Sequence, residues 1–408
     1  MSDDTKVNLK TIEAARDIVV NKIIRTPLTY STMLSELVEC EVHLKLENLQ
    51  LTGAYKVRGA LNKISKLTES EKAAGIIASS AGNHAQGVAL AAKKNGIEAT
   101  IVMPETTPLS KILGTKRFGA NIVLHGKFYD EAYQYAKTLQ QEKGLTFIHP
   151  FNDPDIISGQ GTVGLEIFED MKDLDIVVIP IGGGGLISGI STALKELNPK
   201  IKIIGVEATN MAAMNQSIIE DKLVKIPKMK TIADGIAVTE VKDLTFNIVK
   251  KNVDEIVTVS ESEMAHSVMQ LLEVEKILAE PSGAASFAAI YYNKIKNIKG
   301  KKIGLVISGG NIDLNFLDKI IERGLIADGR LLNFKVIVPD NPGMISEVSS
   351  IIGSAGANIL DIFHDRFNPY SNFKQTQVKF TIETKGHEHV KEILSQIEES
   401  GFTVVKEN

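Results

Sequence analysis

The hydrophobic positions of the chain follow two different patterns, one before and one after about residue 325. From residue 74 onward, short apolar runs alternate with longer segments of helical periodicity; examples are GIIAS (75–79), DIVVIPIG (175–182) and KIGLVISGG (302–310). Several runs are continuously apolar, which is typical of strands buried on both faces of a parallel sheet. The pattern predicts an α/β body over the first 325 residues, with ligands bound at the carboxyl ends of its strands.

The pattern changes in the last quarter of the chain. FKVIVPD (334–340) and QTQVKFTIET (375–384) alternate between apolar and polar positions, as half-buried strands do. Helical periodicity covers GMISEVSSIIGSAG (343–356) and HVKEILSQIEE (389–399), and NILDIFHD and FTVV complete the series. The order βαββαβ predicts a separate ferredoxin-like domain over residues 332–408.

Composition narrows the classes of partner. Lys and Arg (46) nearly balance Asp and Glu (50), and neither sign forms a long run, so we expect no nucleic acid and no membrane partner. Cys40 is the single cysteine, which excludes an intrachain disulfide and favours a reducing cytosol. Residues 1–10 lack the features of a signal peptide, and no apolar stretch approaches ~18 residues. These features predict a cytoplasmic protein with a small-molecule ligand.

The segment TGAYKVRGA (52–60) raises the first chemical question. It reads as a helix start with Thr52 as the N-cap, and Lys56 lies on the flank of its apolar stripe. A single lysine is usually a solvated surface cation. The alternative is an amine half buried at the positive end of a helix, where its pKa falls and it becomes a nucleophile. The local sequence does not decide between the two.

Four consecutive glycines follow the apolar run DIVVIP: Gly182, Gly183, Gly184 and Gly185. Leu186 then opens a helical pattern, so backbone N–H groups and the helix start together favour a phosphate cradle over a simple flexible turn. The motif lacks Gly-Lys-Ser/Thr and lies midway along the chain, which weakens both the P-loop and the dinucleotide interpretations.

The stretch SSAGNHAQG (79–87) also lies between an apolar run and a helical pattern. Its Ser, Gly and Asn residues offer donors for a carboxylate or a phenolic oxygen, whereas the simpler interpretation is helix capping by Ser80 or Asn83. No partner carboxylate is visible for His84, so a hydrogen-bonded structural histidine is favoured over a general base.

These three stretches, followed by EPSGA (280–284) and SGGN (308–311), occur in one order. Together they resemble the pyridoxal-phosphate (PLP) enzymes of the tryptophan-synthase β fold, fold type II, and most closely the threonine dehydratase (threonine ammonia-lyase) family. The similarity covers residues 10–325. It implies a two-lobed catalytic domain over residues 1–325, with a smaller lobe at about 54–148 inserted in the larger one.

The resemblance assigns a role to each motif. Lys56 matches the family's Schiff-base lysine, and Tyr55 matches an aromatic residue near the cofactor ring. Asn83 matches the partner of the ring's 3′-oxygen, Ser308 the hydroxyl facing the pyridine nitrogen, and Gly182 to Leu186 the phosphate loop. Ser80, Ala81, Gly82 and His84 match the loop that grips the substrate carboxylate.

Two departures from related enzymes refine the expected reaction, which is dehydration and deamination of threonine to 2-oxobutanoate, with serine giving pyruvate. Serine racemases resemble the chain too, but Ala81 stands where they carry a second serine that protonates the opposite face of Cα. A serine dehydratase or racemase remains an alternative, as does a non-catalytic amino-acid sensor. Serine racemases also carry a divalent-metal motif. It matches Glu207 to Ala213 of this chain, where alanine replaces aspartate, so we expect no metal site.

The tail resembles an ACT domain, an amino-acid-sensing module that binds ligands between paired copies. The resemblance places effector contacts at Asn341, Gly343, Asn358 and Ile359 and implies a homodimer or homotetramer. A purely structural dimerisation domain is the alternative. Isoleucine is the natural feedback candidate, but many such enzymes carry two modules and this chain has one, which leaves open another branched-chain amino acid or no effector.

Overall fold

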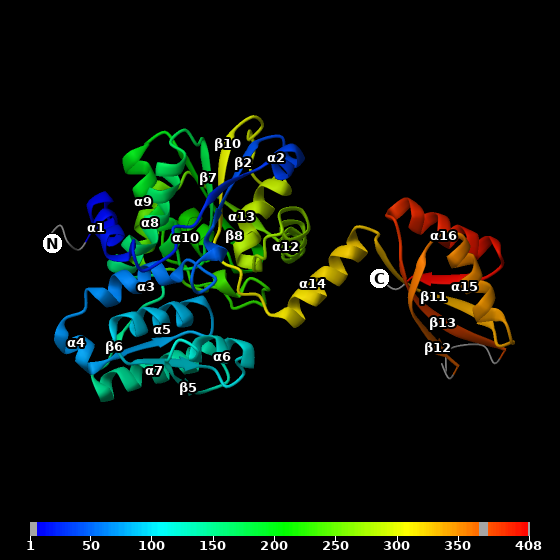
Figure 1. The fold of residues 1–408 in the computed structure, drawn as a ribbon, viewed down its shortest axis with the longest axis horizontal. Helices are drawn as coiled ribbons and strands as arrows, with labels where there is room; N and C mark the ends of the chain where they lie inside the picture. The colour runs from blue at the N-terminus through cyan, green and yellow to red at the C-terminus, as the bar shows by residue number, and fades with distance from the viewer. Residues whose placement is uncertain (1–5, 367–373, 407–408) are drawn as a thin grey trace. The chain divides into compact units, whose positions relative to one another are not determined.

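The computed structural model describes residues 6–366 and 374–406, which fall into two compact units, Met1–Asp313 and Leu314–Asn408 (Figure 1). The first unit has two lobes, each built on its own sheet. Helix α14 (Leu314–Ala327) groups with the second unit, so the division lies at Asp313. No helix within the described ranges is both long and apolar enough to cross a bilayer.

The larger lobe contains a six-stranded sheet in the order β1-β2-β10-β7-β8-β9. All neighbouring strands run parallel except β1 and β2, which pair antiparallel. The apolar run IVVIP forms β7, and all its residues are buried, as the continuous pattern predicts. The strands are β1 (Leu28–Ser31), β2 (Glu41–Leu46), β7 (Ile176–Pro180), β8 (Lys202–Ala208), β9 (Glu255–Val259) and β10 (Lys302–Ile307).

The smaller lobe contains an all-parallel sheet in the order β5-β4-β3-β6. Helices cover both of its faces, with one core cluster on the α5 side and a second on the α7 side (Figure 1). Its elements are β3 (Ile76–Ser79), α5 (Asn83–Asn95), β4 (Ala99–Met103), α6 (Leu109–Lys116), β5 (Asn121–Leu124), α7 (Tyr129–Lys143) and β6 (Thr146–Phe147).

The remaining helices of the first unit surround the large sheet or join the lobes. The α-helices are α1 (Leu9–Val19), α2 (Thr32–Val38), α3 (Lys56–Ser65), α4 (Glu69–Ala74), α8 (Pro154–Asp170), α9 (Gly185–Leu197), α10 (Ala213–Glu220), α11 (Asp243–Asn252), α12 (Glu261–Glu275) and α13 (Pro281–Tyr291). The short 3₁₀ helices are η2 (Glu47–Leu49), η3 (Thr209–Met211) and η4 (Asp234–Ile236).

Helix α3 connects the lobes, because it packs against α5 of the smaller lobe and α8 of the larger one. Gly59 allows this approach: a methyl group built on Gly159 would lie 2.6 Å from the Gly59 Cα. The predicted N-cap is wrong. The helix starts at Lys56 after Tyr55, without a side-chain cap, and the Thr52 hydroxyl donates to Ala54 O instead. The Gly53 turn, at φ +69°, sets this later start.

The second unit has the predicted βαββαβ order and forms an antiparallel sheet in the order β12-β13-β11-β14. Its buried cluster includes Phe334 and Phe380, whose rings stack at 5.7 Å. The elements after α14 are β11 (Leu331–Pro339), α15 (Met344–Ser354), β12 (Asn358–Asp365), β13 (Gln375–Glu383), α16 (His387–Glu399) and β14 (Thr403–Lys406).

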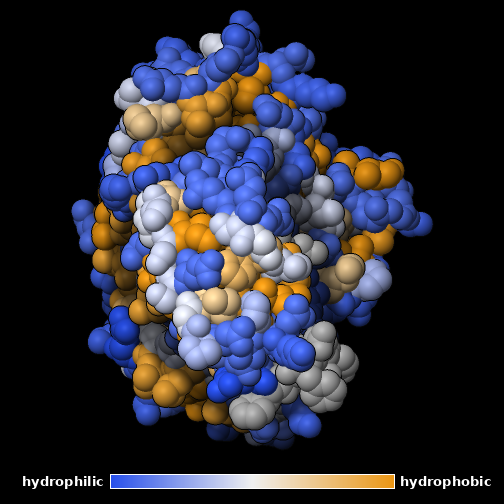
Figure 2. All heavy atoms as spheres, turned by 90° about the vertical axis from the view of Figure 1, so that its right-hand side faces the viewer, coloured by the Kyte–Doolittle hydropathy of each residue, from blue (hydrophilic) through white to orange (hydrophobic). Residues whose placement is uncertain are grey.

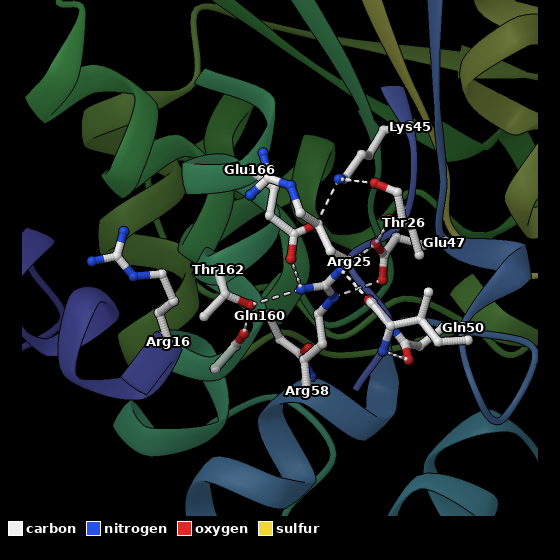
Figure 3. Close-up of polar contacts among 12 residues, drawn as sticks. Arg16, Arg25, Thr26, Lys45, Glu47, Gln50, Arg58, Gln160, Thr162 and Glu166 are labelled. Atoms are coloured by element: carbon white, nitrogen blue, oxygen red, sulfur yellow. Dashed lines mark hydrogen bonds and ion pairs between the residues drawn. The ribbon is translucent and has the colours of Figure 1, made fainter. Parts of the chain in front are cut away.

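A buried ion cluster centred on Arg58, two residues after Lys56, holds α3 in place (Figure 3). The Arg58 guanidinium donates to both carboxylate oxygens of Glu47, at 2.7 and 2.8 Å, and of Glu166, at 2.6 and 2.9 Å. Lys45 Nζ reaches Glu166 at 2.6 Å. Arg58, Lys45 and Glu47 are fully buried. Burial alone would raise the pKa of Glu166, but the two cations lower it overall. The cluster therefore joins α3 to η2, β2 and α8.

We predict that Arg58→Met strongly destabilises the protein, because it leaves two buried carboxylates with one cation. The expected loss in unfolding free energy is about 3–5 kcal/mol, measured by chemical denaturation. Lys72→Met is the control: it breaks the surface pair with Glu69, which should cost at most about 1 kcal/mol. Equal losses in the two variants would contradict the assigned role of the cluster.

Candidate active site

Lys56 is the first residue of α3, and its side chain is half buried at the junction of the lobes. Its Nζ donates to the carbonyl oxygen of Pro150 at 3.0 Å and lies 5.2 Å from the ring centroid of Tyr55. Burial lowers the pKa of the Lys56 amine to about 8, against an opposing effect of Glu280. The solvated-lysine interpretation is therefore wrong for this residue, because a desolvated amine near neutral pH is a nucleophile and a base.

Backbone pairing brings the SGGN motif beside the lysine turn. Tyr55 N donates to Ser308 O at 3.2 Å, and Gly310 N donates to Gly53 O at 2.9 Å. Ser308 follows β10, is 5% exposed, and its hydroxyl bonds to no other described residue. Burial, with the charge of Glu280, raises the pKa of Tyr55, so its phenol stays protonated. Residues about 250 positions apart thus pair through an isolated antiparallel bridge between Ala54 and Gly309.

The glycine run forms the turn between β7 and α9. A methyl group on Gly183 would overlap the Phe151 ring, and one on Gly185 would lie 2.9 Å from the Phe151 side chain. Gly184 has φ +89°, which favours glycine. Within the described residues, the backbone N–H groups of Gly182 to Ile187, including Leu186, donate to no other atom. A row of free donors at a helix start is suited to an anion.

Asn83 begins α5 and has partners for both ends of its amide. Its Nδ2 donates to Glu280 Oε1 at 2.8 Å, and its Oδ1 accepts from Asn311 Nδ2 at 2.8 Å. Burial raises the pKa of Glu280 to about 6. Asn83, Glu280 and Asn311 therefore form a polar group that links EPSGA, SGGN and the start of α5.

The stretch from Ser80 to His84 connects β3 to α5. Neither predicted capping residue caps the helix: Gly82 is the N-cap position, and Ser80 Oγ accepts the Gly82 N–H at 3.2 Å. A methyl group on Gly82 would meet nothing within 4 Å, and Ala81 is half buried against the lobe core. His84 is buried, and its Nε2 donates to Ile148 O at 2.9 Å. Burial lowers the pKa of His84 to about 3, so its ring is neutral.

The four residues proposed for effector binding do not come together within one chain. Asn358 faces Glu383, which in turn faces Leu331 at the first residue of β11. Asn341 and Gly343 instead follow Pro339, the last residue of β11. The two pairs thus lie at opposite ends of the sheet, roughly 25 Å apart along the strand. Ile359 packs on the core beside Ile382.

Sequence reasoning gave no role to several residues that the fold places here. Glu280 and Asn311 stood inside recognised motifs, so their position already pointed to the site. The turn between β6 and α8 contains His149, Pro150 and Phe151. From the sequence alone this stretch was only the end of an apolar run. Glu207, expected to lack a metal partner, accepts the N–H groups of Met214 and Asn215 at 3.0 and 2.7 Å.

The chemistry of this donor set fits pyridoxal phosphate. The free N–H groups of the glycine loop suit its phosphate, the Lys56 amine suits its aldehyde, and the unpartnered Ser308 hydroxyl suits its ring nitrogen. The four glycines leave no Cβ in the phosphate loop, so backbone atoms face the ligand directly. Lys56, Ser308 and Gly182 to Leu186 are therefore the residues that would hold the group.

We predict that Lys56 in the cofactor-free protein becomes reactive with a midpoint near pH 8. Below that pH the ammonium form dominates, and above it the neutral amine reacts; an unperturbed lysine would titrate near ~10.4. The rate of acylation at Lys56 as a function of pH, followed by peptide mass spectrometry, measures this midpoint. A midpoint above pH 10 would show that the amine is solvated.

Comparison with known proteins agrees with this chemistry. The family model described as "Pyridoxal-phosphate dependent enzyme" matches residues 19–309. The chain is 48% identical to the L-threonine ammonia-lyase of Thermotoga maritima over 398 residues, covering 98% of this chain and 99% of that protein. The processed form of threonine deaminase isoform 2 from Solanum lycopersicum matches with TM-score 0.74 and 39% identity, covering 79% and 94% of the two chains.

Maize serine racemase matches with the same TM-score of 0.74 at 35% identity, covering 79% of this chain and 98% of that one. The similar structures thus include both a deaminase and a racemase, whereas the Thermotoga maritima relative, which matches over nearly its whole length, is an ammonia-lyase. The chain belongs to the family of pyridoxal-phosphate-dependent enzymes, and it is a lyase.

Proposed function

We propose that this enzyme converts L-threonine to 2-oxobutanoate and ammonia. The observation that carries the proposal is its 48% identity to an L-threonine ammonia-lyase over nearly the whole length of both chains. The buried, low-pKa Lys56 beside a row of free backbone donors supports the same assignment. L-serine, which lacks only the methyl group, is the expected second substrate and would give pyruvate.

Each residue of the site has a task in this reaction. Bound pyridoxal phosphate supplies the electron sink for the bond that breaks at Cα. Lys56 acts as general base toward the Cα proton, and its low pKa keeps a useful fraction of the amine neutral. The Ser80 hydroxyl and the backbone N–H groups at the start of α5 bind the substrate carboxylate. Ser308 is neutral, so it does not hold a full positive charge on the ring nitrogen, and this favours elimination over long-lived carbanion chemistry.

The main alternative is a serine dehydratase or racemase, because maize serine racemase is also similar. A racemase needs an acid on the face of Cα opposite the lysine. Ala81 offers no such group at the position where the resemblance expects it. This absence of a proton donor favours dehydration over racemisation.

We predict that the wild-type protein releases 2-oxobutanoate from L-threonine and that Lys56→Ala loses at least about 1,000-fold in kcat, because it removes the general base. The 2-oxo acid is measured by coupled reduction, and chiral chromatography measures D-serine formed from L-serine. Borohydride reduction of the holoenzyme should label the Lys56 peptide.

Arg16→Ala serves as the control, because Arg16 pairs with Glu169 on the surface outside the site. A label on another lysine would contradict the assignment of Lys56. Racemisation that exceeds elimination would favour the racemase alternative.

We further propose that the C-terminal unit is an ACT-like regulatory domain, and that it acts as a pair formed by the C-terminal units of two chains. Its βαββαβ order and antiparallel sheet support this proposal. Because Asn341 and Gly343 lie at the end of the sheet opposite Asn358, an effector that contacts all three requires two chains. The edge strand β12 exposes Leu360 (51%) and Phe363 (61%). Hydrophobic residues also lie among the hydrophilic ones on the face of the molecule drawn in Figure 2. Apolar edge strands are suited to pairing.

We predict that one branched-chain amino acid changes the activity and raises the melting temperature of the full-length enzyme, because it binds the paired sheets. Thermal shift and activity are measured with isoleucine, valine and leucine. Asn358→Ala should raise the half-effective concentration about tenfold by removing a polar contact. If none of these amino acids alters activity or melting temperature, the unit is structural.

A further inference from the structure

The short segment from Ile148 to Asn152 joins β6 to α8 and contacts several motifs of the active site. Ile148 O accepts from His84 of the substrate loop at 2.9 Å. Pro150 O accepts from Lys56 Nζ at 3.0 Å. The Phe151 side chain packs so closely on Gly183 and Gly185 that neither glycine could carry a methyl group. The position of this backbone therefore determines what the lysine and the glycine loop can contact.

His149 holds the conformation of the segment from within. Its Nδ1 accepts the backbone N–H of Phe151 at 3.2 Å and that of Asn152 at 2.8 Å. Its ring also packs edge-on against the Phe151 ring, with centroids 4.7 Å apart. The ends of the segment are fixed independently, because β6 pairs with β3 and Asp153 caps α8. The imidazole thus fixes the one part of the turn that regular structure does not.

The imidazole must be neutral to do this, since Nδ1 has to accept two hydrogen bonds. Burial lowers the pKa of His149 to about 4, although Asp153 opposes the shift. Around neutral pH the ring therefore carries its single proton on Nε2 and leaves Nδ1 as an acceptor. This tautomer follows from the two backbone donors that point at Nδ1.

We propose that His149 is a positioning residue of the active site: by fixing the turn at 149–152, it directs the Pro150 carbonyl at the Lys56 amine and seats Phe151 against the glycine loop. The carbonyl accepts one N–H of Lys56 and restricts a side chain with four rotatable bonds. The lone pair of the neutral amine stays available for a proton. The inference depends on the cofactor family and not on the identity of the substrate.

Two substitutions with the same functional group test this role. Asn at position 149 places its Oδ1 acceptor near the position of Nδ1, whereas Gln carries its acceptor one methylene further out. His149→Asn should bind pyridoxal phosphate within about threefold of the wild-type Kd, and His149→Gln should raise the Kd at least about tenfold. The Kd is measured by spectroscopic titration of the cofactor-free protein. His125→Gln is the background control, because His125 stacks on Tyr135 on the surface of the smaller lobe.

A second readout is the pH midpoint of Lys56 acylation in the cofactor-free variants. In His149→Gln the displaced turn exposes the amine to water, and this added solvation should move the midpoint upward, while His149→Asn keeps the wild-type value. Thermal unfolding of all variants checks that they are folded. Equal Kd values and equal midpoints in His149→Asn and His149→Gln would overturn the proposal and leave His149 with a packing role only.

Discussion

The active site depends on one constraint: the amine of Lys56 must be held out of water at the place where a helix begins. Burial lowers its pKa to about 8, and its Nζ donates a hydrogen bond to the Pro150 carbonyl oxygen at 3.0 Å. A carbonyl partner holds the amine in place without adding a full negative charge beside it. Glu280, the acid whose charge opposes this shift, has its own pKa raised by burial to about 6.

This constraint explains why buried polar contacts and a close backbone contact join α3 to its surroundings. The helix bears Lys56 on its first turn, and the Arg58 cluster joins the same turn to η2, β2 and α8. Buried ion pairs are costly compared with apolar packing, but breaking one partner is costlier still, so such a cluster specifies a single arrangement. Gly59 and Gly159 add a close backbone contact between α3 and α8. A sliding helix would move the amine away from its carbonyl partner.

The site lies where the two lobes meet, and each lobe contributes two segments to it. The smaller lobe brings the start of α5 and the turn after β6, and the larger lobe brings the glycine loop and the end of β10. Asn83 of the smaller lobe bonds with Glu280 and Asn311 of the larger one. Polar groups that follow parallel strands of the two sheets thus come together, as expected for α/β folds.

The sequence alone indicated most of the strands and the anion-binding character of the glycine run, because these depend on local patterns. Apolar runs predicted β3 to β10, alternation predicted β11 and β13, and four glycines in a row indicated an anion site. Tertiary structure decided which lysine is desolvated and which atoms face it. Pro150 and Glu280 act through contacts with residues about 90 to 200 positions away. Local patterns contain no information on such contacts, because they arise only when the chain folds and excludes water.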